Sequence, residues 1–298
     1  MDKKKVKAVL LLLFTVMMYG LSFVSIKISM VVFPPISMAF YRFLIACFVL
    51  YPILQRLSPG EKLKKKNIPL MAISGILGIT LYFYLENNGV LRISSNDASI
   101  IIAMIPIAAA IAESIFLKKK LSLISLLAIF TSIFGIYMII GGKLDGGSAL
   151  GYLYMIGAIL AFTAFLIITK PLFNLYSDIA VTFYQGLFGT IAFIPFLLFE
   201  KVRWELLTPT ILFHFLFLAI GCSALGNYFY LYALNNLSVA TAAIFMNLIP
   251  VFTFIFSYFI FGDTLSLPQL VGAMVVIISV SIVTIQDSRL AKKKQLQL

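Results

Sequence analysis

Ten apolar segments, each about twenty residues long and separated by short polar loops, constrain the fold of this chain more than any other feature. A helix that rises 1.5 Å per residue needs roughly 20 apolar residues to cross a hydrocarbon core about 30 Å thick. Of the 298 residues, 62% are hydrophobic and only 11% are charged, whereas about a quarter are charged in soluble domains. We therefore expect an all-α membrane protein with ten transmembrane helices, at residues 8–30, 36–56, 67–88, 97–117, 121–141, 149–170, 178–199, 209–234, 239–261 and 265–286.

The Lys and Arg residues outside these segments are distributed unevenly between the two sides of the predicted bundle. Seventeen fall on the side of the termini and four on the other. Because cytoplasmic loops are rich in Lys and Arg, we expect both termini in the cytoplasm and a multi-pass protein of the cytoplasmic (plasma) membrane. The net charge of +12 comes from these short loop clusters, so it indicates orientation and not a nucleic-acid-binding face. The basic N-terminus resembles a signal peptide, but no small-residue cleavage site follows, so we expect it to remain as the first helix.

The chain repeats itself after about 144 residues. The phrase "YFYLENN", which begins at Tyr82, returns as "YFYLYALNN" from Tyr228, and Pro106 aligns with Pro250. Each half then contains five segments, so the second half enters the membrane from the opposite side. We expect two inverted repeats of five helices, residues 1–144 and 145–298, an architecture typical of secondary transporters that bind their substrate between the repeats and alternate its access to the two sides.

Ordered motif elements accompany this duplication. They are "YGLSFVSIK" from Tyr19, "PP" at Pro34 and "RF" at Arg42 in the first half, and Tyr230, Ala233, Leu234, Ala242, Pro250, Gly262, Asp263 and Gly272 in the second. Over essentially its whole length the chain resembles the ten-helix EamA branch of the drug/metabolite transporter superfamily. It departs from that pattern at Tyr19, where Trp is usual, and at Lys118–Lys120, which replaces a "G-E" turn. The resemblance implies movement of small metabolites, mostly export, through a cavity lined by helices 1, 3, 4, 6, 8 and 9, with helices 5 and 10 at the periphery.

Four ionisable residues fall inside predicted spans, where each costs at least about 2.5–3.5 kcal/mol near the bilayer centre. We identify Lys27, Arg42, Glu86 and Glu113 as candidate gating or ion-coupling residues. Lys27 lies near the outer interface, where it either snorkels or acts in function. Glu86 and Arg42 have similar depth and opposite charge, so a pair of Glu86 with Arg42 or Lys27 would serve as an outer gate or a structural clip. Glu113 either forms an ion pair at a helix end with Lys118 or couples transport to protons.

Neutral polar residues near the predicted midplane are the candidate substrate-binding groups. They are Tyr19, Ser22, Tyr82, Asn227, Tyr228, Tyr232 and Asn247, and the same residue types also occur in plain helix packing. Tyr228 and Tyr232 are four residues apart and so share one helix face. Pro106 and Pro250 are the candidate hinges, since a proline frees a backbone carbonyl within its helix. An aromatic pocket with a few amides suits a small amphipathic solute.

The sequence contains no pattern for a catalytic residue, a metal site or a cofactor. His214 is the only histidine, and Cys47 and Cys222 lie in apolar runs, where we expect them to pack. The leading hypothesis is therefore not an enzyme but a secondary transporter of small metabolites such as amino acids, more plausibly an exporter. The alternatives are proton-coupled efflux of organic cations, a membrane-embedded enzyme or lipid-handling protein, and a structural or receptor subunit. Expected partners are a small-molecule substrate, membrane lipids and protons as a coupling ion, with no nucleic acid, in a monomer or homodimer.

Overall fold

All secondary structure in the described residues is helical. The computed structural model describes residues 3–116, 123–140, 147–236, 245–262, 264 and 266–295. Its α-helices are α1 (Lys3–Ser29), α2 (Pro35–Leu57), α3 (Ile68–Gly75), α4 (Tyr82–Arg92), α5 (Ser95–Ile102), α6 (Ile105–Phe116), α7 (Leu123–Ile140), α8 (Ala149–Thr169), α9 (Asp178–Phe193), α10 (Pro209–Leu216), α11 (Asn227–Asn236), α13 (Ile249–Phe261) and α14 (Leu267–Gln295). The 3-10 segments are η1 (Lys65–Asn67), η3 (Lys170–Asn174), η4 (Ile194–Phe199) and η5 (Trp204–Leu206), and the π-helical segments are η2 (Ile76–Leu81) and η6 (Phe217–Gly226).

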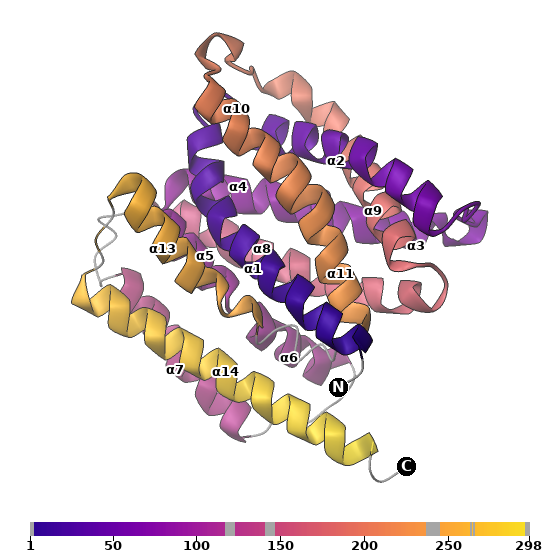
Figure 1. Cartoon of the computed structure of the whole chain (residues 1–298). Helices are drawn as coiled ribbons and strands as arrows, with labels where there is room; N and C mark the ends of the chain where they lie inside the picture. The colour runs from indigo at the N-terminus through magenta and orange to yellow at the C-terminus, as the bar shows by residue number, and fades with distance from the viewer. Residues whose placement is uncertain are drawn as a thin grey trace.

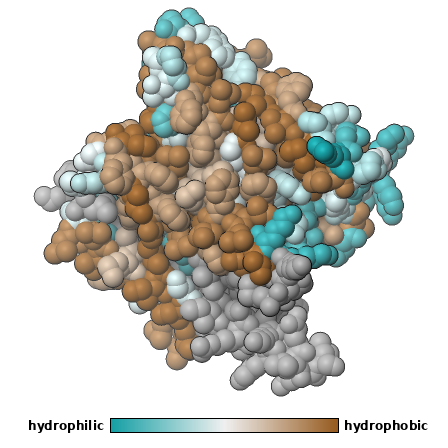
Figure 2. Space-filling model, in the orientation of Figure 1, coloured by the Kyte–Doolittle hydropathy of each residue, from teal (hydrophilic) through white to brown (hydrophobic). Residues whose placement is uncertain are grey.

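Six continuous helical stretches are long and apolar enough to cross a membrane. They are Val6–Ser29, Pro35–Leu57, Lys65–Arg92, Ala149–Asn174, Asp178–Phe199 and Pro209–Asn236, and shorter apolar helices occupy Ser95–Ala109, Leu126–Gly135, Ile249–Phe261 and Leu267–Ser279. In Figure 2 hydrophobic residues cover most of the visible described surface, and hydrophilic ones gather at its upper and right-hand edges. Such an apolar exterior suits contact with lipid. The all-helical prediction is thus confirmed for the described residues, while the count of ten spans and the inversion of the repeats remain predictions.

Each half contains one helix whose regular winding is interrupted by a π-helical segment. In the first half η2 lies between α3 and α4, and in the second η6 lies between α10 and α11. A π-helix adds a residue to each turn, so it changes the face that the following residues present. Tyr82 is the first residue after η2, and Asn227 is the first after η6.

A second interruption occurs in each half just before a proline. Ala103 and Met104 form a turn between α5 and α6, two residues before Pro106, and Asn247 and Leu248 form a turn two residues before Pro250. Proline has no N–H group and cannot continue the hydrogen-bond ladder to the residue four positions earlier. Both predicted hinge prolines therefore lie immediately after real breaks in their helices.

The two halves pack against each other through matching pairs of helices. Helix α7 lies beside α14 at one edge of the molecule, and α2 packs on α9 (Figure 1). Helix α1 contacts α13 and α11 of the second half, and α8 contacts α6 and α4 of the first. Each of these contacts has an equivalent in the other half: the contact of α1 with α13 corresponds to that of α8 with α6, and the contact of α1 with α11 to that of α8 with α4. The contacts are those expected of two similar halves related by an approximate two-fold axis.

Glutamates in two loops cap the helices of the opposite half. Glu200 accepts hydrogen bonds from the backbone N–H groups of Ile36 (3.0 Å) and Ser37 (2.7 Å) at the start of α2. Glu61 accepts bonds from the backbone N–H (2.8 Å) and the hydroxyl (2.5 Å) of Ser177 at the start of α9. These reciprocal caps join the loop that follows each of α2 and α9 to the first turn of the other. Together with the α2–α9 packing, they connect the two halves.

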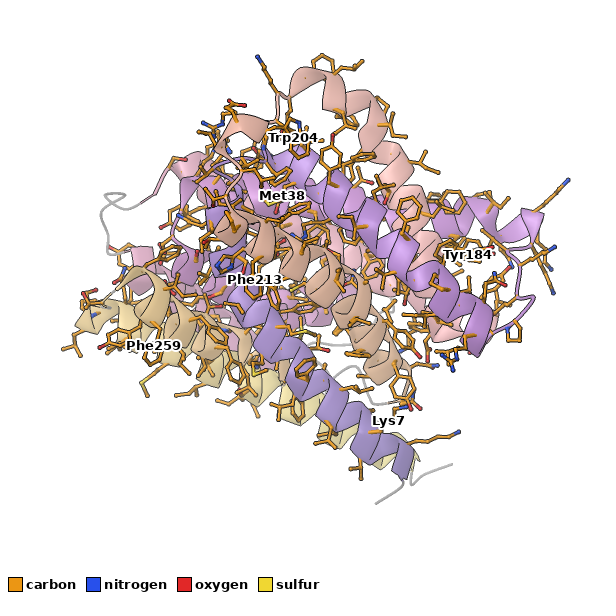
Figure 3. All side chains as sticks on the ribbon, turned by 45° about the horizontal axis from the view of Figure 1, so that its top comes forward. Lys7, Met38, Tyr184, Trp204, Phe213 and Phe259 are labelled. Carbon is orange, nitrogen blue, oxygen red and sulfur yellow. The ribbon has the colours of Figure 1, made fainter. Side chains whose placement is uncertain are left out.

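Trp204, the only tryptophan in the chain, lies close to the Glu200 cap. Its ring lies edge-on to Phe33, with 5.4 Å between the ring centroids, and 5.8 Å from the ring of Tyr41. In Figure 3 Trp204 and Lys7 lie at opposite ends of the bundle. The loop that contains Trp204 is thereby packed over the C-terminal end of α1, far from the chain's N-terminus.

Candidate functional site

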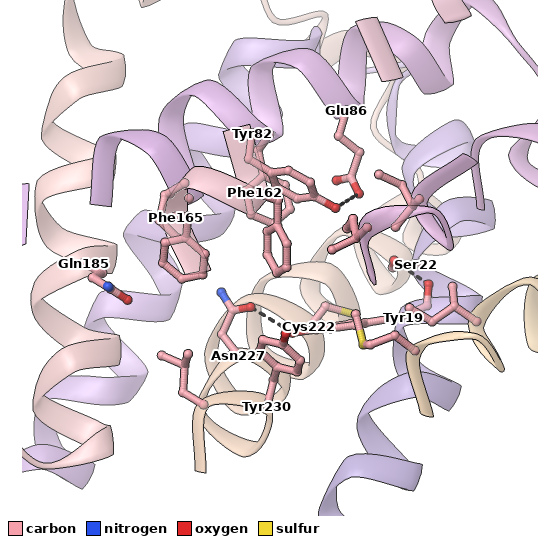
Figure 4. A pocket seen from close by; sticks show the side chains of 18 of the residues that line it. Tyr19, Ser22, Tyr82, Glu86, Phe162, Phe165, Gln185, Cys222, Asn227 and Tyr230 are labelled. Atoms are coloured by element: carbon pink, nitrogen blue, oxygen red, sulfur yellow. Dashed lines mark hydrogen bonds between the residues drawn. The ribbon is translucent and has the colours of Figure 1, made fainter. Parts of the chain in front are cut away.

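A central cavity lies between the two halves (Figure 4). Its volume is about 60 Å³, which is room for a few water molecules at roughly 10–15 Å³ each. The described lining residues come from α1, α2, η2, α4, α5, α6, α8, α9, η6, α11 and α13, with Met246 just before α13. Neither α7 nor α14 contributes a described lining residue. The cavity therefore lies at the interface between the halves, which is where the predicted inverted-repeat architecture would place a substrate.

Arg42 and Glu86 place one positive and one negative group at this cavity. Arg42, on α2, is only 2% exposed and donates from Nε to the hydroxyl of Ser223 at 3.1 Å. Its guanidinium carbon also lies 5.0 Å from the ring centroid of Phe83. Its Nη1 is buried and has no hydrogen-bond partner. A buried N–H donor without an acceptor lowers the stability of the folded protein, so the position of Nη1 needs a physical reason.

Glu86 is 5% exposed and is held by a neighbour on its own helix. The hydroxyl of Tyr82, one turn earlier on α4, donates to Oε1 of Glu86 at 2.7 Å (Figure 4). Among the hydrogen bonds of the described residues, none joins Glu86 to Arg42. The two charges line one cavity and attract each other electrostatically, although no described hydrogen bond joins them directly. Their role as an outer gate or a structural clip stays a prediction.

The side of the cavity opposite Tyr82 and Glu86 is formed by Tyr19 and Asn227 (Figure 4). The hydroxyl of Tyr19 donates to Oδ1 of Asn227 at 2.8 Å, which joins α1 of the first half to α11 of the second. Ser22 also lines the cavity, but its hydroxyl donates to the backbone carbonyl of Tyr19 at 2.7 Å. Of the seven residues predicted to bind substrate, the structure brings four together here: Tyr19, Ser22, Tyr82 and Asn227.

The lining repeats between the two halves. Counting 143 or 144 residues along the chain from a lining position in the first half repeatedly reaches a lining position in the second. The pairs related in this way are Tyr19 and Phe162, Ser22 and Phe165, Arg42 and Gln185, Ile102 and Met246, and Ile105 and Ile249. Equivalent positions face one cavity only if the axis relating the halves passes close to it. The shape of the lining is therefore shared by the halves, whereas the charged side chains among the described lining residues, Arg42 and Glu86, both belong to the first half.

Tyr228 and Tyr232 are not among the residues that line the cavity. The ring of Tyr232 instead lies 5.4 Å from the ammonium group of Lys7. The reason is the helical register: the π-helical segment η6 is ten residues long and η2 is six. The structural counterpart of Tyr82 is therefore Asn227, one residue before the tyrosine that the repeated phrase aligns with it.

The remaining predicted residues lie around the cavity, not in its lining. Asn247 is buried at the turn before Pro250, where Nδ2 donates weakly to Ser281 (3.5 Å) and Oδ1 has no hydrogen-bond partner. Lys27 interacts electrostatically with Asp97 near the start of α5. The backbone of Glu113 belongs to α6, but its side chain lies outside the described residues, as does Lys118.

Two lining residues, Gln185 and Cys222, were not among the predicted site residues. Gln185 is 2% exposed, and its Nε2 donates to Ser74 (3.0 Å) and Thr169 (2.9 Å). Its alignment with Arg42 in the other half is the signal that would have identified it. Cys222, expected only to pack, also faces the cavity, and its thiol lies 3.6 Å from the carbonyl of Met18.

Comparisons with known proteins agree with this architecture. The profile of the EamA-like transporter family matches residues 6–141 and again residues 149–285. An uncharacterized transporter of Archaeoglobus fulgidus is 27% identical over 92% of this chain and 97% of its own length. The uncharacterized transporter YetK of Bacillus subtilis is 25% identical over 98% of this chain and 89% of its own length. A solved crystal structure with 13% sequence identity superposes with a TM-score of 0.69 over 95% of this chain and 98% of that one, which shows the shared fold.

Proposed function

Because the chain belongs to the EamA-like transporter family, we propose that it is a secondary active transporter of small polar or amphipathic metabolites, such as amino acids or their derivatives. It exports them across the cytoplasmic membrane by alternating access around the central cavity. Ten spans in two inverted repeats form the scaffold, with both termini in the cytoplasm. Multi-pass membrane transport follows from the family; the substrate, direction and mechanism are the proposal.

One observation carries this proposal: positions related by the internal repeat line the same cavity. An inverted pair of similar halves has two conformations of comparable energy, because each half can adopt the shape of the other. A cavity on the axis between them opens to one side in one conformation and to the other side in the second. The helix breaks before Pro106 and Pro250 are equivalent in the two halves and supply matching points of bending.

The inverted topology is tested by thiol labelling in intact cells. The Glu61 and Glu200 caps belong to the loops that follow α2 and α9, and inverted repeats place these loops on opposite sides of the membrane. Lys62 and Lys201 are exposed residues of the two loops. In a background with both native cysteines replaced, K201C is expected to react with an impermeant maleimide from outside and K62C only after the membrane is opened. Labelling of both from the same side would refute the inverted arrangement.

Transport is tested by flux into proteoliposomes that contain the purified protein. A panel of radiolabelled amino acids, organic acids, amines and sugars is offered with and without a pH gradient. Saturable uptake of at least one class that depends on the protein is expected, whereas an enzyme, a receptor or a structural subunit would give none. Organic-cation efflux is the weaker alternative, because Arg42 in the same cavity repels a cation that Glu86 would attract.

A further inference from the structure

The Nη1 atom of Arg42 is buried, lacks a hydrogen-bond partner and belongs to a side chain that lines the central cavity. Arg42 is only 2% exposed, and the one hydrogen bond that the described structure gives its guanidinium runs from Nε to Ser223. A guanidinium has five N–H donors and stays charged at any physiological pH. Burying it with a donor unused is unfavourable unless another group completes it. Because the Arg42 side chain lines the cavity, an acceptor that enters the cavity is the candidate for this partner.

The nearest fixed negative charge does not fill this role. Glu86 lines the same cavity, but its recorded hydrogen bond is from Tyr82, and no described bond connects it to Arg42. The other described lining groups are neutral and mostly aromatic or aliphatic. The cavity therefore offers one unused charged donor within an apolar wall. This donor suits a carboxylate, which accepts charge-assisted hydrogen bonds from guanidinium in shorter and stronger contacts than neutral acceptors make.

We propose that Arg42 binds a carboxylate of the transported solute, so that the substrates of the cavity are small monocarboxylic acids, with or without an ammonium group, and not amines or neutral solutes. This inference rests on the proposed transport function and names the substrate class for it. The hydroxyl of Ser223 accepts the hydrogen bond from Nε of Arg42, and the guanidinium carbon lies over the ring of Phe83. Nη1 is then available for the ligand. The solute's apolar part then contacts the aromatic lining.

The charges of the cavity also limit which anions fit. Among the described lining residues Arg42 is the one cationic side chain and Glu86 the one acidic one. A phosphate group carries close to two negative charges near neutral pH, which a single arginine beside a carboxylate does not compensate. A solute with one carboxylate adds one negative charge to a lining whose two charges cancel, and an ammonium group on the same solute neutralises it opposite Glu86. Zwitterions are thus matched best, monoanions leave one uncompensated charge, and dianions leave two.

The experiment uses matched sets of ligands on the purified full-length protein. For ethyl, isobutyl and benzyl side groups, the carboxylate, the amino acid, the amine and the neutral amide are compared by thermal stabilisation and by competition for flux in proteoliposomes. A ligand stabilises the state that it binds, so binding raises the unfolding temperature. Carboxylates and amino acids of at least one side group are expected to bind, and the matching amines and amides are expected to bind at least 10-fold more weakly.

Variants then locate the interaction. Arg42→Gln is expected to weaken carboxylate binding at least 10-fold and to reduce the preference over the amide to less than threefold. Arg56→Gln, in the last turn of the same helix and exposed, is the matched control and is expected to keep both. If Arg42→Gln does not fold, the wild-type protein's choice among the matched ligands still decides the matter.

The outcomes separate the two proposals. Equal binding of amines or amides, or an unchanged carboxylate preference in Arg42→Gln, would overturn the role of Arg42 while transport itself stands. The role of Arg42 would also be overturned if no carboxylate of any side group bound. Carboxylate binding that Arg42→Gln abolishes, without flux of any solute in the wild type, would support the site and overturn the transport function.

Discussion

Glu200→Gln weakens one of the two described glutamate caps that connect the halves. It does so at the start of α2, where no other described side chain accepts hydrogen bonds from the first backbone N–H groups. The first turn of α2 begins with Pro34 and Pro35, which have no side-chain oxygen for a cap, and Pro35 has no N–H group to satisfy. The N–H of Met38 bonds to the carbonyl of Pro34 at 2.8 Å. The N–H groups of Ile36 and Ser37 depend on Glu200 alone in the described structure. The carboxylate therefore completes the hydrogen bonding of this helix end.

The size of the effect follows from these two bonds. Hydrogen bonds to a charged group contribute about 1.5–3 kcal/mol each, and a negative charge at a helix N-terminus adds about 0.3–1 kcal/mol. Glutamine keeps one acceptor oxygen and turns the other into an NH₂ group that faces an N–H donor, so one bond and the charge are lost. Since Glu200 is partly exposed, solvent screening reduces the loss to about 1–2 kcal/mol. For a chain of this length that is a fall in unfolding temperature of about 2–5 °C.

The assay is thermal unfolding of the purified protein in detergent, followed by the fluorescence of a thiol-reactive dye. Glu205, exposed in the same loop, provides the control, and Glu205→Gln is expected to change the unfolding temperature by less than about 1 °C. Glu61→Gln is expected to lower the unfolding temperature in the same direction, since Glu61 accepts one bond from the backbone N–H of Ser177 and one from its hydroxyl. Equal unfolding temperatures for Glu200→Gln and Glu205→Gln would refute the capping argument.

Three further predictions concern the helix packing, the charges and the loop over α1. Gly189→Ala would press its new methyl group against the Ile79 side chain in η2 and the Gly75 carbonyl in α3, and it is expected to lower the free energy of unfolding by about 1–3 kcal/mol. Gly186→Ala is the control one turn earlier, where only the Cys47 thiol lies nearby at 3.5 Å, and it is expected to leave the stability unchanged or to raise it. Equal shifts in unfolding temperature for the two variants would contradict this. Glu86→Gln removes the negative charge that a bound monocarboxylate meets near Arg42 and is expected to tighten its binding about 10-fold in a thermal-shift titration, with weaker or unchanged binding as the contrary result. Emission of the single Trp204 is expected to stay constant at saturating ligand, because its ring packs on Phe33 and on Tyr41 of α2, beside the Glu200 cap, and a spectral shift would show that this loop moves.

The broad architecture could be predicted because a segment that crosses a lipid bilayer must be apolar and must satisfy its backbone hydrogen bonds internally. Apolar length predicted the long helices such as α1 and α8, and most described helical stretches begin and end within about five residues of the predicted spans, whereas α14 continues to Gln295, past the predicted end at residue 286. The family resemblance implied that helices 5 and 10 lie at the periphery, and α7 and α14 lie beside each other at one edge of the molecule. Charge inside a span predicted that Arg42 and Glu86 needed a special place, and both line the cavity.

The details that the sequence did not reveal depend on register and on distant contacts. The repeated phrase aligned Tyr82 with Tyr228, but the longer π-helical segment η6 turns Asn227 toward the cavity instead. No local pattern predicts where a helix adopts π winding. The Glu61 and Glu200 caps join residues more than 100 positions apart, and only the packed structure brings them together.

The distribution of charge within the cavity bears on how the proposed alternating access would work. Arg42 and Glu86 come from α2 and α4, while their counterparts in the second half are neutral. A buried charge that loses its polar partners destabilises the protein strongly, so Arg42 and Glu86 must keep their partners in each conformation. The α2–α9 pair is held together by its packing and by the Glu200 and Glu61 caps. Within the described residues, the interrupted helices at Pro106 and Pro250 have no glutamate cap from the other half, and each presents lining residues to the cavity. The access change is therefore expected to occur by movement of α5–α6 and α13 relative to the α2–α9 pair, with the solute held on the charged half throughout.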